Sequence, residues 1–385
     1  MLFSLEALQA GKGDCLILHY GKPAAPRFIV IDGGPAGIYS QSLEPRLKKL
    51  SRKWSGEGGQ LPIDMLVVSH IDDDHIRGVN DWMRSLQDGE STPCRIATLW
   101  YNSFDAILGN AASELRSRVA AFAASASGGE SNAAPLSALS ARVITASVTQ
   151  GREVRERADA MGIPLNLGFD GLVAAQDGAN AISRPDGLKV RVVGPSIARL
   201  RDLQKDWDEN VRANPDPVVA AAFADRSVPN LSSIVLVAEL QAKRMLLTGD
   251  ARGDEIQAGL KGAGLLDAGG KAHFDLIKMP HHGSCRNMTA QWLEQITADH
   301  YVISANGENG NPDPETIEWL CKARGDAPYT IYMTNQDMVD PKGNKQIGKL
   351  VSAALASYAG PGCKVVYRKP ANLSVQVDLF NKLSY

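Results

Sequence analysis

The chain lacks a long apolar run. None of its segments approaches the roughly 18 consecutive apolar residues that a membrane-spanning helix needs. Its first residues carry no basic region, and Glu6 interrupts their apolar character, so we expect no signal peptide. Together these absences predict a cytoplasmic protein without a membrane partner.

Cysteine is scarce and dispersed. The chain has only five cysteines, and no two of them form a Cys-x-x-Cys pair. This spacing excludes a cysteine-based zinc ribbon, and the odd number fits a reducing compartment.

Neither sign of charge dominates the 385 residues. Lysine and arginine number 41 and aspartate and glutamate 43, which gives a formal net charge of −2. No overall basic field therefore points to nucleic acid, although a local basic groove would suffice to bind it. The apolar fraction of 44% is ordinary for a globular protein, and the length allows one elaborated domain or two.

Short apolar runs alternate with amphipathic segments, a pattern that predicts an α/β protein. Residues 43–54 have apolar side chains at helical spacing and five basic residues on the other face, which is weak support for nucleic-acid binding. We interpret the Ala/Ser-rich residues 104–165 as a helical insertion. We expect residues 1–340 to form one domain and residues 341–385 a C-terminal extension packed on it.

The segment "SHIDDDHIRGV", residues 69–79, directly follows the apolar run 63–68. Three consecutive carboxylates repel one another, and burying them is costly unless a cation compensates. The loop is therefore either solvated or holds a cation. An EF-hand calcium loop does not fit, because counting from Asp72 the glycine needed at the sixth position is replaced by Arg77.

Other predicted strands also end in potential metal ligands. Asp32, Asp250 and the pair His281-His282 each follow an apolar run. Each of them alone is ordinary turn chemistry. Because a strand's carboxyl end can hold side chains rigidly around one point, their occurrence together with the aspartate cluster favours a metal site.

The cluster offers two sets of ligands. His70 and Asp72 alternate along the chain and can face one point, whereas Asp74 and His75 can face a second point a few ångströms away. Asp250 could bridge the two. This is the ligand set of a two-metal site, whose ions lie about 3.5–4 Å apart.

These motifs, in this order, resemble the metallo-β-lactamase superfamily, whose usual signature is H-x-H-x-D-H followed by a histidine, a bridging aspartate and a final histidine. Here the signature stands as residues 70–75, with Asp72 in place of the second histidine. That variant resembles the branch found in the soluble domain of ComEC-type DNA-uptake proteins. So do, in order, the segments "AGKGDCLIL", "FIVIDGG", "VRVVGPS", "NLSSIVLV", "MLLTGDA" and "LIKMPHHGS".

The resemblance implies a four-layer αββα sandwich with a helical insertion and a short C-terminal α/β extension. It implies a metal-dependent hydrolase with two divalent ions, Mn²⁺ or Zn²⁺, acting as a phosphodiesterase or nuclease on nucleic acid. A hydrolase of a small ester, such as a phosphocholine-type diester or a lactone, is the main alternative. A non-catalytic binding module is a third. The chain gives no indication of protein partners.

The resemblance also implies a role for each site residue. His70 and Asp72 would hold the first ion. Asp74, His75 and His282 would hold the second, and Asp250 would bridge the two; Asp74 would also serve catalysis. Outside this ligand set, His281 would face the substrate, Asn230 would be a weak ligand in place of the superfamily's middle histidine, and Asp32 would orient ligands. Lys278 would stabilise charge that develops on the substrate, or is a strand-end residue that reaches solvent. The oxygen-rich first site predicts higher activity with manganese than with zinc.

Overall fold

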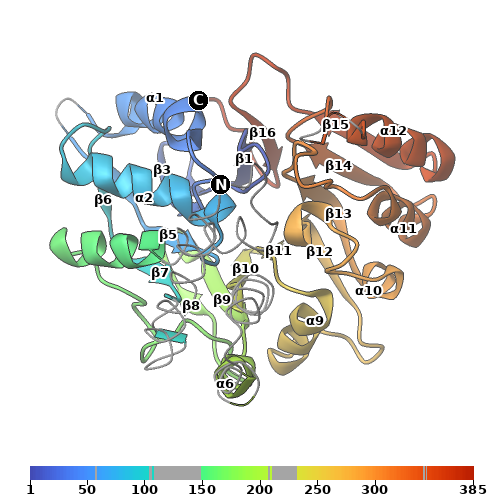
Figure 1. Cartoon of the computed structure of the whole chain (residues 1–385), viewed down its shortest axis with the longest axis horizontal. Helices are drawn as coiled ribbons and strands as arrows, with labels where there is room; N and C mark the ends of the chain where they lie inside the picture. Colours follow the sequence, from blue (N-terminus) through green and yellow to red (C-terminus); the bar gives the residue numbers. More distant parts are fainter. Residues whose placement is uncertain are drawn as a thin grey trace, which may run out of the picture.

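The computed structural model describes residues 1–56, 59–103, 106–107, 149–206, 209, 232–340, 343 and 345–385. Two large β-sheets form its centre (Figure 1). The six-stranded sheet has the order β16 (Ser374–Asp378), β1 (Leu2–Leu8), β2 (Leu16–Lys22), β3 (Ala25–Ile31), β5 (Met65–Val68) and β7 (Leu99–Tyr101). The eight-stranded sheet has the order β15 (Cys363–Tyr367), β14 (Tyr329–Met333), β13 (Ile296–Ile303), β12 (Ala272–Lys278), β11 (Lys243–Leu247), β10 (Val235–Leu240), β9 (Lys189–Gly194) and β8 (Ile182–Ser183).

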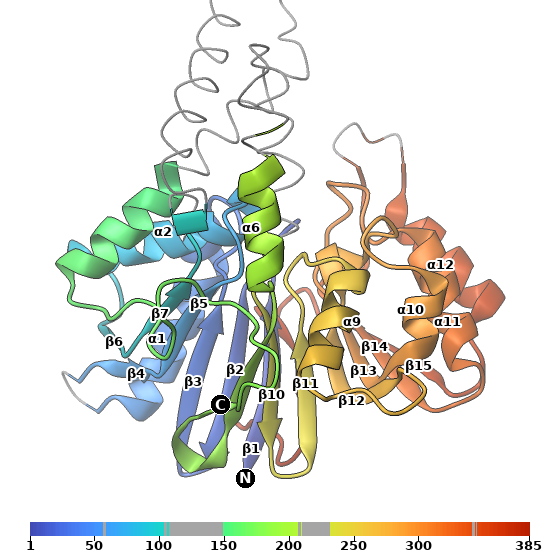
Figure 2. The same ribbon diagram turned by 90° about the horizontal axis from the view of Figure 1, so that it is seen from below.

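Helices cover the outer face of each sheet (Figure 2). The six-stranded sheet is covered by α1 (Glu44–Trp54) and α2 (Asp73–Gln87). The eight-stranded sheet is covered by α9 (Gly253–Gly262), α10 (Ala290–Gln295), α11 (Pro314–Arg324) and α12 (Ile347–Tyr358). The remaining named elements are β4 (Leu61–Ile63), β6 (Cys94–Ile96), α6 (Ile197–Asp206) and the short helices η1 (Tyr39–Leu43), η2 (Pro185–Gly187) and η4 (Pro280–Gly283).

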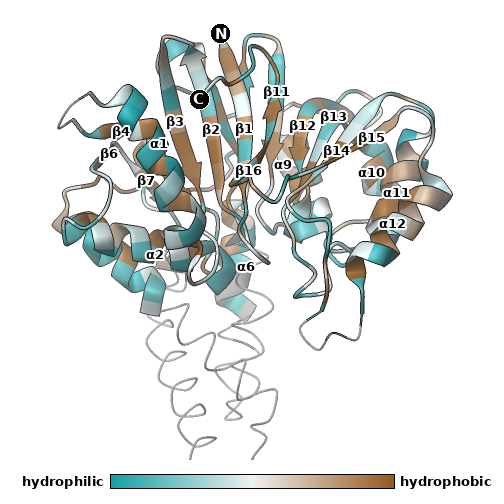
Figure 3. Cartoon of the chain, turned by 90° about the horizontal axis from the view of Figure 1, so that it is seen from above, coloured by the Kyte–Doolittle hydropathy of each residue, from teal (hydrophilic) through white to brown (hydrophobic). Residues whose placement is uncertain are grey.

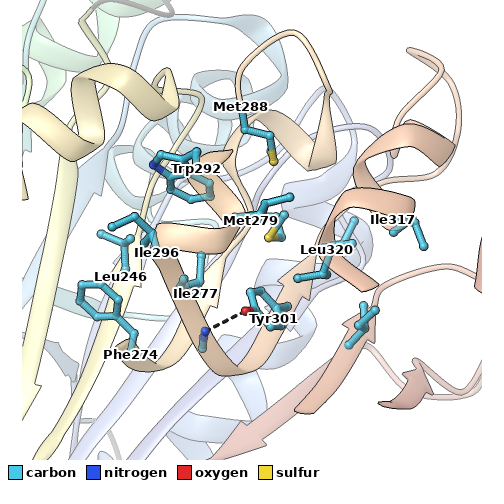
Figure 4. Close-up of a cluster of buried hydrophobic side chains, with 14 of the residues drawn as sticks. Leu246, Phe274, Ile277, Met279, Met288, Trp292, Ile296, Tyr301, Ile317 and Leu320 are labelled. Atoms are coloured by element: carbon cyan, nitrogen blue, oxygen red, sulfur yellow. Dashed lines mark hydrogen bonds between the residues drawn. The ribbon is translucent and has the colours of Figure 1, made fainter. Parts of the chain in front are cut away.

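Three separate hydrophobic cores lie between these four layers. Strand β5 contributes side chains to two of these cores. Leu66 and Val68 pack toward the helices, whereas Met65 and Val67 pack against the second sheet. A strand buried on both faces needs a continuous apolar sequence, and the central strands are largely brown in Figure 3. Figure 4 shows the third core, where side chains of the second sheet meet Trp292 and Leu320 of its helices. The predicted αββα sandwich is confirmed.

The last residues of the chain complete both sheets. β15 is an edge strand of the eight-stranded sheet, and β16 pairs antiparallel with β1, with Ser4 opposite Asp378. The domain boundary proposed at residue 340 stays a prediction. Within the predicted insertion, residues 149–160 form a helix that places Val154 in the first core, and residues 108–148 lie outside the described part. Of the helices that the structure describes, none has the length and apolarity to cross a bilayer.

Candidate metal centre

The predicted ligands meet at one edge of the sandwich because parallel strands end there. In the first sheet β3 runs parallel to β5, and in the second β11 runs parallel to β12. β5 leads into His70 and the first turn of α2, for which Asp72 is the N-cap residue. β11 leads to Asp250, and β12 leads into the short helix η4, which contains His281 and His282.

Close backbone approach fixes the start of α2 against the end of β3. A Cβ atom on Gly78 would lie 1.9 Å from the carbonyl oxygen of Gly33, so no larger residue fits there. The Gly33 N–H also donates to the carbonyl of His75 at 2.8 Å. The glycines of the sequence therefore set the position of the histidine side chain.

The centre of the site is formed by His75, His282 and Asp250, all buried. The Nε2 atoms of the two histidines lie 3.2 Å apart, and the Asp250 carboxylate oxygens lie 3.4 Å from His75 Nε2 and 3.6 Å from His282 Nε2. Two ligand nitrogens on one tetrahedral zinc ion are about 3.3 Å apart, given Zn–N bonds of about 2.0–2.1 Å. The spacing suits a divalent cation held among the three side chains.

Further ligands stand on both sides of Asp250. His70 Nε2 lies 3.7 Å from Asp250 Oδ2 and 3.6 Å from Asp72 Oδ2. The Asp74 oxygens lie 3.9 Å from His75 Nε2 and 3.9 Å from His282 Nε2. The structure thus brings together the two predicted sets of ligands, with Asp250 between them.

Two unsatisfied atoms indicate that a cation fits this cluster. His70 Nε2 and Asp250 Oδ1 are buried and have no hydrogen-bond partner. A buried polar group without a partner costs about 1–3 kcal/mol, a cost that coordination to a metal ion removes. The residues present therefore fit the predicted divalent ions.

The pKa shifts of the buried side chains also indicate that the cluster attracts a cation. Burial would lower the pKa of His75, but the charges of Asp250 and Asp32 outweigh it and raise that pKa well above its usual value. Burial would likewise raise the pKa of Asp250, but the neighbouring histidines outweigh it and hold that pKa well below its usual value. The acidic cluster attracts positive charge, and metal ions and protons compete for it.

Asp32 contacts the His75 ring at Nδ1, the nitrogen that faces away from the cluster. One Asp32 oxygen accepts from the Ser69 N–H at 2.7 Å and the other from the Ser69 hydroxyl at 2.6 Å. His75 Nδ1 lies 2.8 Å from the second oxygen, and donation from this atom leaves the Nε2 lone pair free to face the cluster. The orienting role of Asp32 stays a prediction, and it would act through this contact.

The adjacent histidines of η4 differ in exposure. His282 is 1% exposed, and its Nδ1 donates to the Ser304 carbonyl at 2.9 Å, which turns Nε2 toward the cluster. His281 is 31% exposed, with Nδ1 2.7 Å from Asn287 Oδ1 and Nε2 3.6 Å from Asp250 Oδ2. His282 thus occupies an interior position and His281 the rim of the cluster.

Asp14 was missed by the sequence analysis. It is 1% exposed, and its Oδ1 lies 3.5 Å from His282 Nδ1 while its Oδ2 forms an ion pair with Lys278. The ligand atoms of Asp14, His75, Asp250 and His282 all lie within 4.8 Å of one another. The available signal was an aspartate in the turn "GKGD" immediately before a buried strand.

Lys278 does not reach solvent, so the alternative that it is a strand-end residue extending into solvent is wrong. It is fully buried, its Nζ donates to the Gly249 carbonyl at 3.2 Å, and it lies 3.9 Å from Asp250 Oδ1. Its catalytic role stays a prediction. Asn230 lies outside the described residues. Ser233, three positions later in the sequence, accepts a hydrogen bond at its Oγ from the Asp250 N–H at 3.2 Å.

No protein-family model and no curated protein matches the chain. Among solved structures, it is similar to Zn²⁺-bound PqqB from Methylobacterium extorquens (10% identity, 98% of this chain and 100% of that one, TM-score 0.45). It is also similar to the metallo-beta-lactamase fold protein YhfI from Bacillus subtilis (8% identity, 98% and 99%, TM-score 0.38) and to a variant of CmlA beta-hydroxylase (11% identity, 97% and 54%, TM-score 0.35). These values are too low to support an argument about function.

Proposed function

We propose that the protein is a metal-dependent hydrolase that cleaves phosphodiesters, with nucleic acid as its substrate class. The observation that carries this proposal is the position of Asp250, whose carboxylate lies between the ligand pair His70 and Asp72 and the ligand set Asp74, His75 and His282. Two divalent ions held there would supply Lewis acidity and an acidified water, the chemistry of two-metal hydrolysis.

The chain's own residues support this chemistry in distinct ways. Asp32 and the Ser304 carbonyl each hold the Nδ1 of a histidine, so that His75 and His282 present Nε2 as an electron-pair donor. His281 stands at the rim, held by Asn287 through Nδ1. When the ring carries a proton on both nitrogens, its Nε2–H can give a proton to the oxygen that leaves.

The oxygen content of the site favours a phosphodiester over a carbonyl substrate. Asp72, where the superfamily pattern has a histidine, is 40% exposed and supplies a carboxylate beside His70. Carboxylate oxygens suit Mn²⁺ and Mg²⁺ better than imidazole does, and such ions serve phosphoryl oxygens well. The motif resemblance to the ComEC-type branch supports the same substrate class.

A small ester is the second candidate, because one observation favours it. A cavity of about 150 Å³ is lined by Val193, Pro195, Ala258 and Ala251, the residue after Asp250, together with the acidic residues Asp177 and Glu255. A partly apolar cavity suits the tail of a small ester.

A reconstitution screen tests the proposal. Protein stripped of metal is loaded with Mn²⁺ or Zn²⁺ and assayed on DNA, RNA, a chromogenic phosphodiester and a lactone. We expect metal-dependent hydrolysis of phosphodiesters, higher with Mn²⁺ than with Zn²⁺, that is abolished in Asp250→Ala. Hydrolysis of the lactone alone would replace the phosphodiesterase proposal by the small-ester candidate.

A further inference from the structure

A second cavity, outside the metal centre, is lined by basic residues. It has a volume of about 380 Å³ and opens between α1 and the segment that joins β15 to β16. Its charged side chains are four cations, Arg46, Lys49, Arg368 and Lys369, and one carboxylate, Glu6. In a chain whose net charge is −2, this is a local concentration of positive charge.

The one carboxylate is already neutralised. Glu6 is 3% exposed, and its Oε2 accepts from Arg46 Nε at 2.9 Å and lies 2.9 Å from His19 Nε2. Arg46 is itself 6% exposed and also donates to the backbone oxygen of Tyr385, the last residue of the sequence, at 3.0 Å. Glu6 and Arg46 thus neutralise each other, and no other carboxylate side chain lines the cavity beside the remaining three cations.

Those three cations have no acidic partner within the part of the chain that the structure describes. Arg368 donates to backbone carbonyls instead: to Thr334 at 2.9 Å, to Lys369 at 3.1 Å and to Asn372 at 2.6 Å. These neutral acceptors fix the guanidinium without cancelling its charge. Lys49 on α1 and Lys369 after β15 are both exposed, so the cavity presents a cation from each of its walls.

The cavity is connected to the metal centre through one turn of the chain. The carbonyl of Leu373, on the cavity wall, accepts from the Gln9 N–H at 2.8 Å. Gln9 precedes Asp14 by five residues, which span at most about 18 Å even when fully extended. In Figure 1 the C-terminus lies beside α1. The cavity wall at Leu373 therefore lies near Asp14 of the metal centre, and one polymer could reach both sites.

We propose that this cavity binds the phosphate backbone of a nucleic acid strand whose diester bond is presented to the metal centre. The inference rests on the proposed function and adds a substrate-binding surface to it. Lysine acts on phosphate as a point charge without base selectivity, so the surface predicts sequence-independent binding that weakens with salt as counterions are displaced.

The test measures binding without cleavage. Metal-stripped protein is titrated into a fluorescein-labelled oligothymidylate at several salt concentrations, and anisotropy gives the affinity. In Lys49→Glu/Lys369→Glu we expect binding to weaken by about tenfold or more at low salt, and the slope of log affinity against log salt to fall by roughly 1.4, about 0.7 for each lost phosphate contact on a single strand.

A matched control separates this surface from overall charge. Lys261→Glu/Lys271→Glu makes the same charge change at two exposed lysines at the end of α9 and just before β12. We expect its affinity to stay within about twofold of the original protein, because these two lysines lie outside the cavity and act on the oligonucleotide only at long range. In the metal-loaded enzyme, the ratio of oligonucleotide to chromogenic-diester cleavage should fall in Lys49→Glu/Lys369→Glu and stay constant in the control.

Each outcome decides between the two proposals. Unchanged affinity in Lys49→Glu/Lys369→Glu, or an equal loss in the control, overturns the binding surface while leaving hydrolysis untouched. Competition by polyglutamate of the same charge as effective as by unlabelled oligothymidylate would overturn the assignment to nucleic acid. If no phosphodiester is cleaved but binding depends on Lys49 and Lys369, the surface stands and the proposed reaction falls.

Discussion

The ammonium of Lys278 forms an ion pair with the carboxylate of Asp14, and each side chain is only 1% exposed. The pair closes the inner side of the metal centre, because Asp14 lies behind His282 and Lys278 lies beside Asp250. Burial would lower the pKa of Lys278, but Asp14 and Asp250 outweigh it and raise that pKa. Lys278 is thus a permanent internal cation that offsets part of the negative charge of the ligands.

Removing the cation should destabilise the protein. In Lys278→Met the Asp14 carboxylate is left buried without its partner, so we expect the free energy of unfolding to fall by roughly 3–5 kcal/mol. In the double variant Asp14→Leu/Lys278→Met no buried charge remains from the pair, and much of the loss should be recovered. Urea denaturation of metal-stripped protein measures both. A double variant no more stable than Lys278→Met would contradict this account of the pair.

Asp250 should control the metal content of the protein. Because its carboxylate lies between the two sets of ligands, Asp250→Ala should reduce the metal bound per chain below that of the original protein. Elemental analysis after reconstitution measures this. Asp254→Ala, at an exposed residue of the same region that pairs with Arg252, is the control and should bind as much metal as the original. Unchanged metal content in Asp250→Ala would refute the bridging role.

The two histidines of η4 should have separable functions. His282 is interior and His281 is at the rim, so His282→Ala should lose metal, whereas His281→Ala should retain it. His281→Ala should nevertheless lose most phosphodiester cleavage, by about 10²-fold or more if it acts as the proton donor. Metal analysis and kinetics on both variants decide the assignment. Metal loss in His281→Ala alone would reverse it.

The sequence predicted what depends on local order along the chain. His70, Asp250 and His282 could be placed together because each follows a strand, and parallel strands end at a common edge. The orienting role of Asp32 was predicted from the motif resemblance alone. The four layers followed from continuous apolar runs together with the motif resemblance.

The remainder depends on contacts between distant segments. The burial of Lys278 arises from the turn that carries Asp14, which packs against β12 from the other end of the chain. Nothing near Lys278 in the sequence distinguishes a lysine that meets an aspartate from one that meets substrate. The pairing of β16 with β1 is equally non-local, because an alternating strand does not specify its partner. The basic cavity between α1 and the residues after β15 likewise forms only because β16 pairs with β1.

Glu6 should make the stability of the protein depend on acid pH. Burial would raise its pKa, but the hydrogen bond from His19 and the charges of His19 and Arg46 outweigh it and lower the pKa from 4.5 to about 2. Because the folded-state pKa lies below that of the unfolded chain, the stabilisation is fully present above about pH 4.5 and is lost as the pH falls toward 2. The difference corresponds to roughly 3 kcal/mol.

Unfolding measured between pH 2 and 6 should therefore show a shallower acid dependence in Glu6→Gln than in the original protein. Glu90→Gln, at an exposed position, should keep the original profile. An identical acid profile in Glu6→Gln and the original protein would show that the buried carboxylate contributes nothing to it.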